Sequence, residues 1–131
     1  MPDGPSLAIA NIGQIAIPIQ DLDRAVAFYR DTLGLKFLFS APPSLAFFDC
    51  GGVRLMLSPP EGGQAPHLGS VLYFRVPDLQ AAHAQLEQRG AVIVEKPHLI
   101  APMPDHDLWM SFFRDSEGNL LALMAEIVRK R

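Results

Sequence analysis

Hydrophobic and polar residues alternate in the same way in two separate stretches of the chain. Residues 14–22 read Gln-Ile-Ala-Ile-Pro-Ile-Gln-Asp-Leu, and residues 71–79 read Val-Leu-Tyr-Phe-Arg-Val-Pro-Asp-Leu. A period of two predicts a β-strand in each stretch. The Asp-Leu pair that follows predicts a helix start, because aspartate is a good N-cap. The recurrence indicates a duplicated unit, and therefore one domain built from two similar modules.

The first module, at about residues 11–59, has the predicted order βαβββ. A strand at residues 12–19 precedes a helix that Asp21 caps and Gly34 ends. Apolar residues recur at helical spacing within that helix, at Leu22, Val26, Tyr29 and Leu33. Three short strands are expected after it, at residues 35–39, 45–49 and 53–58.

A linker rich in proline and glycine, at about residues 60–69, leads into the second module at about residues 70–127. The order repeats: a strand, a helix that Asp78 caps and Gly90 ends, then three strands. These strands are expected at residues 71–76, 91–95, 108–114 and 120–124. The one departure is a Pro-rich stretch at residues 96–107, which predicts a long loop. Long loops in compact domains often bind ligands or act as lids.

Together the modules predict a single α+β domain over residues 1–131. We expect a curved, mixed, eight-stranded sheet around a cavity, with the helices on the outer face. Strand parity sends the more apolar side chains toward the helices. The opposite face mixes polar and apolar groups, as small-molecule pockets do. It carries Gln14, Arg54, Met56, Val71, Tyr73, Arg75, Ala122 and Met124.

Composition narrows the classes of partner. The formal net charge is −3, and the one basic cluster is at residues 129–131, so neither a nucleic-acid nor a membrane partner is expected. The single cysteine, Cys50, has no partner for an internal disulfide, and the polar start of the chain is unlike a signal peptide. These features predict a cytoplasmic protein.

The helix motif Asp-Leu-Asp-Arg-Ala-Val-Ala-Phe-Tyr-Arg-Asp-Thr-Leu-Gly-Leu at residues 21–35, with Arg-Asp-Ser-Glu-Gly-Asn at residues 114–119, resembles the vicinal oxygen chelate superfamily. That superfamily includes glyoxalase I, extradiol dioxygenases and bleomycin-resistance proteins. The resemblance implies metal ligands at four positions, which are Gln14, Met56, Val71 and Ala122 here. Only Gln14 offers an oxygen donor, so we predict neither a metal nor another cofactor.

Other candidate residues have two readings each. His98 and His106 lie in the predicted loop and, with Trp109, are expected to act as a lid over the cavity. His106, between two aspartates, is a candidate acid–base group, or else part of a hydrophilic loop crest. Arg54 and Arg75 either recognise an anionic ligand or pair with acids at strand ends.

Three functions remain open on this basis. The first is a metal-independent protein of the glyoxalase/bleomycin-resistance type that binds or sequesters an aromatic or anionic small molecule. The second is a glyoxalase-like lyase or isomerase, or a dioxygenase-like enzyme, with a non-standard site, which uses either His106 and Gln14 without a metal or a metal held by the loop residues. The third is a structural or regulatory module. The resemblance also implies a homodimer.

Overall fold

The computed structural model of the protein describes residues 7–59 and 69–129. The predicted order βαβββ is confirmed in both modules. Module one consists of β1 (Gln14–Pro18), α1 (Leu22–Ala27), the π-helical turn η1 (Phe28–Thr32), β2 (Lys36–Ala41), β3 (Leu45–Cys50) and β4 (Val53–Ser58). Module two consists of β5 (Leu72–Arg75), α2 (Leu79–Gln88), β6 (Val92–Pro102), β7 (His106–Arg114) and β8 (Leu120–Val128). Most of the predicted linker, and the last two residues of the basic cluster, lie outside the described residues.

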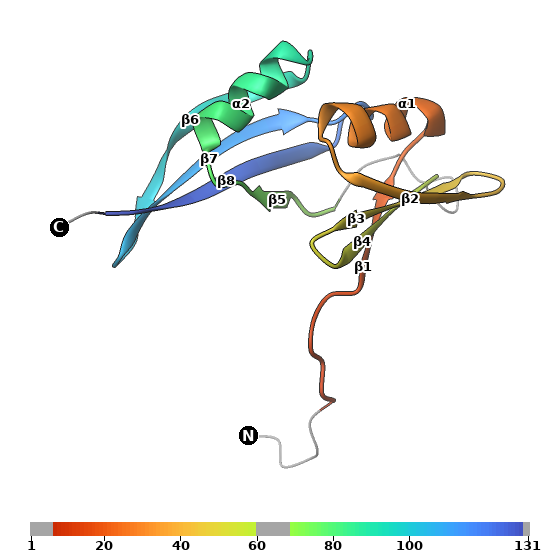
Figure 1. Ribbon diagram of the computed structural model, residues 1–131, viewed down its shortest axis with the longest axis horizontal. Helices are drawn as coiled ribbons and strands as arrows, with labels where there is room; N and C mark the ends of the chain where they lie inside the picture. The colour runs from red at the N-terminus through yellow and green to blue at the C-terminus, as the bar shows by residue number, and fades with distance from the viewer. Residues whose placement is uncertain (1–6, 60–68, 130–131) are drawn as a thin grey trace.

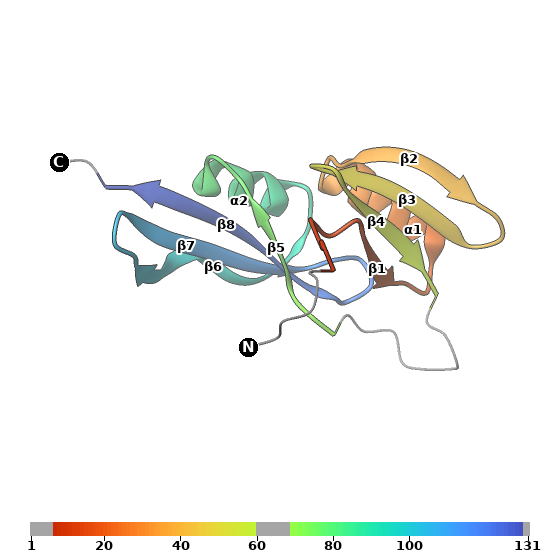
Figure 2. The ribbon, with the colours of Figure 1, turned by 90° about the horizontal axis from the view of Figure 1, so that it is seen from below.

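The eight strands form two four-stranded sheets, one in each module. Their strand orders are β1-β4-β3-β2 and β5-β8-β7-β6, so the two modules have the same topology. In each sheet the first and last strands of the module pair in parallel and the other pairs are antiparallel. Figure 1 shows α1 and α2 covering the same side of the two sheets, and Figure 2 shows the sheets side by side. The α+β class is therefore confirmed, with each module contributing its own sheet.

Alternation along the strands decides which face meets a helix. In β1, Ile17 is buried while Gln14 is exposed, and in β4 Leu55 is buried while Arg54 is exposed. The buried side chains join Tyr29 of η1 in one hydrophobic core. Burial of such apolar surface is the main favourable contribution to folding. The predicted parity is thus confirmed, and it leaves one face of each sheet without a helix, which we name the open face.

Both helices begin where their aspartate caps predict. The side chain of Asp21 accepts a hydrogen bond from the backbone N–H of Arg24 at 3.0 Å, and that of Asp78 accepts one from Ala81 at 3.1 Å. Each bond satisfies one of the N–H groups that a helix leaves unpaired at its start. None of the helices in the described parts of the chain is long and apolar enough to cross a membrane.

The predicted long loop at residues 96–107 is wrong. β6 continues to Pro102 and β7 starts at His106, so this stretch is the end of a β-hairpin. β6 is the edge strand of its sheet. A proline has no backbone N–H to donate, and an edge strand tolerates it because one side of that strand pairs with no other strand. Shifts in register between β6 and β7 accommodate the remaining irregularity. His98 and His106 therefore lie on strands.

A turn at residues 115–119, between β7 and β8, joins the two modules, and we name it the clasp. Asp115 is buried and accepts a hydrogen bond from the Tyr29 hydroxyl at 2.7 Å. Asn119 donates through Nδ2 to the carbonyl oxygen of Pro18 at 3.1 Å. Module two thereby contacts both the end of β1 and the helical segment of module one.

Glu117 is the third side chain of the clasp. Its Oε1 accepts the backbone N–H groups of Gln20 at 2.7 Å and Asp21 at 3.1 Å, and its Oε2 accepts Nε of Arg24 at 2.8 Å. These donors lie at the start of α1, where the helix dipole favours a negative charge. Glu117 thus completes the cap of a helix in the other module.

Candidate functional site

The open face of module one carries a connected polar cluster. Arg54 donates through Nε to Oε1 of Gln14 at 2.7 Å, and Nε2 of Gln14 points at the sulfur of Met56 at 3.7 Å. The register brings these residues together, since Gln14 pairs with Arg54 across β1 and β4. Three residues that the sequence assigned to one face therefore meet there.

Two phenylalanines extend this cluster, and sequence reasoning missed both as site residues. Phe47 of β3 pairs with Met56 across β4, and the guanidinium carbon of Arg54 lies 5.2 Å from the centre of its ring. Phe39 stacks on Phe47 with ring centres 4.7 Å apart. The register of β2 shifts between Phe37 and Phe39, and this irregularity places Phe39 opposite Phe47. A sequence pattern with a strict period of two does not reveal such a bulge.

The residues at the four inherited ligand positions do not fit a divalent metal ion. The oxygen of Gln14 already accepts a hydrogen bond from Arg54, and Met56 presents a thioether. Val71 and Ala122 have no donor atoms on their side chains. Within residues 7–59 and 69–129, no three His, Cys, Asp or Glu side chains are grouped closely enough to hold a metal.

The open face of module two carries a second cluster, at the far end of its sheet. Glu126 is 3.8 Å from Nε of Arg75 and 3.7 Å from Nε2 of His106. Nδ1 of His106 is 2.7 Å from a carboxylate oxygen of Asp105. Sequence reasoning missed Glu126. Side chains alternate along β8, so Glu126 points to the same side as Ala122 and Met124, and this alternation could have identified it.

Tyr73 and His98 also face this open side. Tyr73 is 48% exposed and contacts the edge of Phe112, with ring centres 6.2 Å apart. His98 pairs with Met110 across β7, and its Nε2 is 3.3 Å from Glu95. These residues share the face of Ala122, because Phe112 and Ala122 are partners in the register of β7 and β8.

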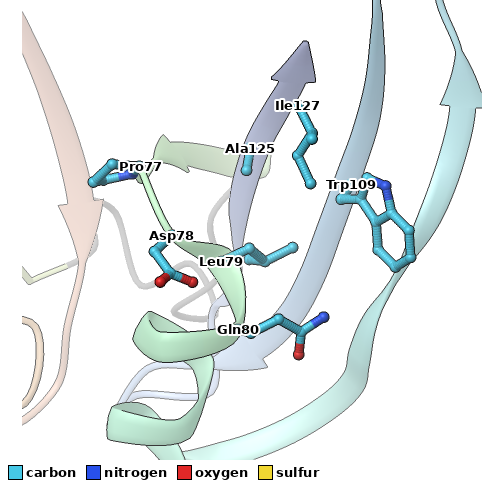
Figure 3. Close-up of a pocket in the computed structure, with 7 residues that line it drawn as sticks. All are labelled: Pro77, Asp78, Leu79, Gln80, Trp109, Ala125 and Ile127. Carbon is cyan, nitrogen blue, oxygen red and sulfur yellow. The ribbon is translucent and has the colours of Figure 1, made fainter. Parts of the chain in front are cut away.

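Trp109 lies on the opposite face, which contradicts its predicted place in a lid over the cavity. As an odd-numbered residue of β7 it pairs with Ala125 and faces the helix side. It lines a pocket of about 340 Å³ beside the start of α2, together with Leu79 and Ile127 (Figure 3). Trp109 lies in the strand predicted at residues 108–114, and the prediction failed because the sequence does not settle which side of that strand faces the cavity.

A larger cavity, of about 580 Å³, lies at the junction of the modules. Module two contributes Tyr73, Arg75 and Met124, three of the predicted ligand residues, and module one contributes Leu33 and Cys50. Burial raises the pKa of the Cys50 thiol, and the nearby Asp49 carboxylate raises it further. The thiol is therefore a weaker nucleophile than an ordinary cysteine, and it contributes apolar surface to the cavity wall.

Paired βαβββ modules with one face of each sheet left open define a class of domains that bind small molecules or catalyse their reactions. Residues 11–123 match the model of the Glyoxalase/Bleomycin resistance protein/Dioxygenase superfamily, and the chain belongs to this superfamily. A glyoxylase-like domain-containing protein of Didymella fabae is 29% identical over 122 residues, covering 86% of this chain and 91% of that protein. YraH of Bacillus subtilis, an uncharacterized protein, is 27% identical over 126 residues, covering 84% and 94%.

Solved structures agree with the fold. TnmS3, an antibiotic binding protein from a Streptomyces species, has a TM-score of 0.75 and 25% identity, and the match covers 92% of this chain and 99% of that one. A lactoylglutathione lyase from Agrobacterium tumefaciens has a TM-score of 0.70 and 24% identity, covering 90% and 95%. One scaffold thus carries binding in one relative and catalysis in another, so function must be argued from the site.

Proposed function

We propose that the protein binds a small aromatic or anionic molecule on its open faces and sequesters it without a metal ion. The observation that carries this proposal is the Gln14–Arg54–Met56 cluster. It occupies the part of module one that supplies metal ligands in metal-dependent relatives, and its one suitable oxygen is held by Arg54. The aromatic rings and arginines around it suit a planar or charged ligand better than a cation.

The antibiotic-binding relative supports a binding role, because TnmS3 shares the fold and 25% of its aligned residues with this chain. The free thiol of Cys50 supports a reducing, cytoplasmic setting. Ligand residues on this reading are those that face the open side of each sheet. They are Gln14, Arg54, Met56, Val71, Tyr73, Arg75, His98, His106 and Met124; Ala122 shares this side of β8 but is fully buried in the single chain.

A homodimer is part of the proposal. The open faces and sheet edges of a single chain leave large apolar side chains in solvent, among them Phe39, Val94 and Leu99. The segment before β1 extends away from the body of the molecule (Figure 1), and its Leu7 and Ile9 are 85% and 83% exposed. Exposed apolar surface of this kind marks an interaction site, and a second copy placed over the open faces covers the apolar side chains on that side and encloses the ligand.

Elemental analysis and ligand-dependent melting test this function. Protein purified without chelator is expected to hold far less than one equivalent of zinc, nickel, manganese or iron, and chelator is expected to leave its melting temperature unchanged. In a library of small aromatic and anionic compounds, ligands are expected to raise that temperature, because binding to the native state stabilises it. Stoichiometric metal, or a library without a single stabilising compound, contradicts the proposal.

The His106 cluster favours one second candidate, an enzyme that uses acid–base catalysis. The imidazole nitrogens lie 2.7 Å from a carboxylate oxygen of Asp105 and 3.7 Å from one of Glu126, so a carboxylate is close to each ring nitrogen and can orient the ring. If a bound compound is converted, His106→Gln is expected to abolish turnover while the compound still binds. Mass spectrometry of the compound after incubation distinguishes conversion from sequestration.

A further inference from the structure

Arg54 differs from the other open-face arginine in its electrostatic environment. Arg75 lies 3.8 Å from the carboxylate of Glu126, which offsets its charge. The partners of Arg54 are neutral: the amide oxygen of Gln14 and the ring of Phe47. In the described parts of the chain no carboxylate lies within ion-pair distance of Arg54, so its positive charge is not compensated by a direct partner.

The charged residues nearest to Arg54 in the sheet carry more positive than negative charge. Asp49 is its neighbour on β3, but the guanidinium bonds to Gln14 on the other side. Lys36 of β2 is in turn the neighbour of Asp49. The row of residues across the four strands therefore contains two cations and one anion. Such a row favours a monoanion as an additional partner.

The orientation of the guanidinium selects the shape of that anion. Its Nε is used by Gln14, and no hydrogen bond joins Nη1 or Nη2 to another described residue. These two nitrogens form a planar fork that matches the two oxygens of a carboxylate. Contacts on two sides, with Gln14 and with the Phe47 ring, restrict the side chain before a ligand arrives. A preorganised fork loses less conformational entropy on binding.

An aromatic surface lies beside this fork. Phe39 stacks on Phe47 at 4.7 Å, with an angle of 28° between the rings, and Phe39 is 47% exposed. The outer ring is therefore available for a further stacked ring, and offset stacking adds to the burial of apolar area. A fork for a carboxylate next to an exposed aromatic ring suits a ligand with both groups in one plane.

We propose that Arg54 is the anion receptor of the open face, and that it binds the carboxylate of a planar aromatic acid whose ring stacks on Phe39. This inference rests on the proposed small-molecule binding function and specifies its ligand class. Arg54 is chosen over Arg75 because Arg75 has the carboxylate of Glu126 at 3.8 Å, whereas Arg54 has no such partner among the described residues.

Two probes of nearly the same shape but different charge test the inference: 2-naphthoate, whose carboxylate can lie in the plane of the ring, and its neutral analogue 2-naphthamide. By isothermal titration calorimetry of the full chain, naphthoate is expected to bind about tenfold or more tightly, as charge-assisted hydrogen bonds allow. Arg54→Met is expected to remove this preference while naphthamide binds as before. Arg54→Lys is expected to restore only part of it, because an ammonium group lacks the planar fork.

Matched variants separate the fork from general charge effects. Arg30→Met removes one positive charge at an exposed position of η1 that pairs with Asp31, and it is expected to leave both probes unaffected. Phe39→Ala is expected to weaken both probes equally, since each loses the same stacking contact. If Arg54→Met does not fold, Arg54→Lys and Phe39→Ala still decide the matter.

Three results overturn the inference. Equal binding of the two probes removes the case for an anion receptor, although small-molecule binding itself stands. If Arg75→Met loses the naphthoate preference and the Arg54 variants keep it, the receptor lies in module two and not in module one. If neither probe binds, the ligand class is wrong, and the compound library separately decides the binding function.

Discussion

The ionisation of Glu117 in the clasp contributes to the stability of the fold. Burial of its carboxylate raises the pKa, but hydrogen bonds from Arg24, from the backbone of Gln20 and Asp21, and from Ser116 outweigh this effect. The pKa falls to about 2, from an ordinary value of 4.5. Because the native state holds the charged form more strongly than the unfolded chain does, the ionised carboxylate stabilises the native state.

This depressed pKa predicts an acid-sensitive contribution to stability. It is fully present above about pH 4.5 and is lost as the pH falls toward about 2, where the native carboxylate takes up a proton. Glu117→Gln is expected to lower the free energy of unfolding at pH 7 by about 1.5–3 kcal/mol and to flatten its pH dependence in that window. Urea denaturation at a series of pH values measures both effects.

Asp23→Asn serves as the control for Glu117→Gln, because Asp23 is an exposed carboxylate on the same helix. It is expected to cost only the small contribution of a first-turn charge to the helix dipole, about 0.3–1 kcal/mol, which is less than the cost of Glu117→Gln. A Glu117→Gln profile that parallels the wild type below pH 4.5 is incompatible with the assigned role.

The hydroxyl of Tyr29 makes a separate prediction. Burial first, and then the Asp115 carboxylate, hold the pKa of this phenol far above its usual range, so it acts only as a donor. Tyr29→Phe is expected to lower the free energy of unfolding by about 1 kcal/mol, since Asn119 still donates to the same oxygen of Asp115. Tyr73→Phe, the same change at an exposed ring, is the control. Equal stability of the two variants in thermal melts argues against the bond to Asp115.

At the scale of elements, the two aspartate caps provide a matched pair. Asp21→Ala and Asp78→Ala are each expected to cost about 0.5–2 kcal/mol in the free energy of unfolding. Asp21→Ala leaves Glu117 bonded to the backbone at the same helix start, so its cost is expected to be the smaller of the two. Chemical denaturation of both variants, with Asp23→Ala as control, measures this order. A larger cost at Asp21 means that Glu117 does not share the capping.

The elements also show which parts of the fold the sequence predicts. Period-two alternation and helix caps give local signals, so β4, α2 and the parity of the open face follow from the residues themselves. The hairpin of β6 and β7 does not, because Pro97 and Pro102 suggest a loop unless β6 is known to be an edge strand. Edge position is a property of the whole sheet. The misplacement of Trp109 has a different cause: its strand was predicted, but not which side of that strand meets the helix.

The candidate site divides in the same way. Gln14, Arg54 and Met56 were predictable, because neighbouring strands and their parity place them together. Phe39 was not, since a register shift in β2 brings it opposite Phe47. The clasp was visible only as a family motif, and its contacts with β1 and α1 depend on the packing of the two modules.

For the whole molecule, the proposed homodimer is a direct prediction. Native mass spectrometry is expected to give twice the 14.4 kDa mass of the chain. Conditions that dissociate the dimer are expected to abolish ligand binding, because each open face then loses its cover. Binding of a ligand with undiminished affinity by a monomer contradicts the enclosed site and leaves a single-chain groove in its place.

The clasp has an evolutionary consequence. Its residues in module two bond to module one, but in the described part of the chain the equivalent turn of module one makes no such bonds to module two. The position that corresponds to Tyr29 in module two is Leu86, which has no hydroxyl to donate. At the turn between β3 and β4, Cys50 and Val53 stand where the clasp has Asp115 and Asn119, and no described residue of that turn bonds to α2. A chain with two copies of either module therefore lacks one half of the contact. The two repeats are no longer interchangeable, and substitutions in each are constrained by the sequence of the other.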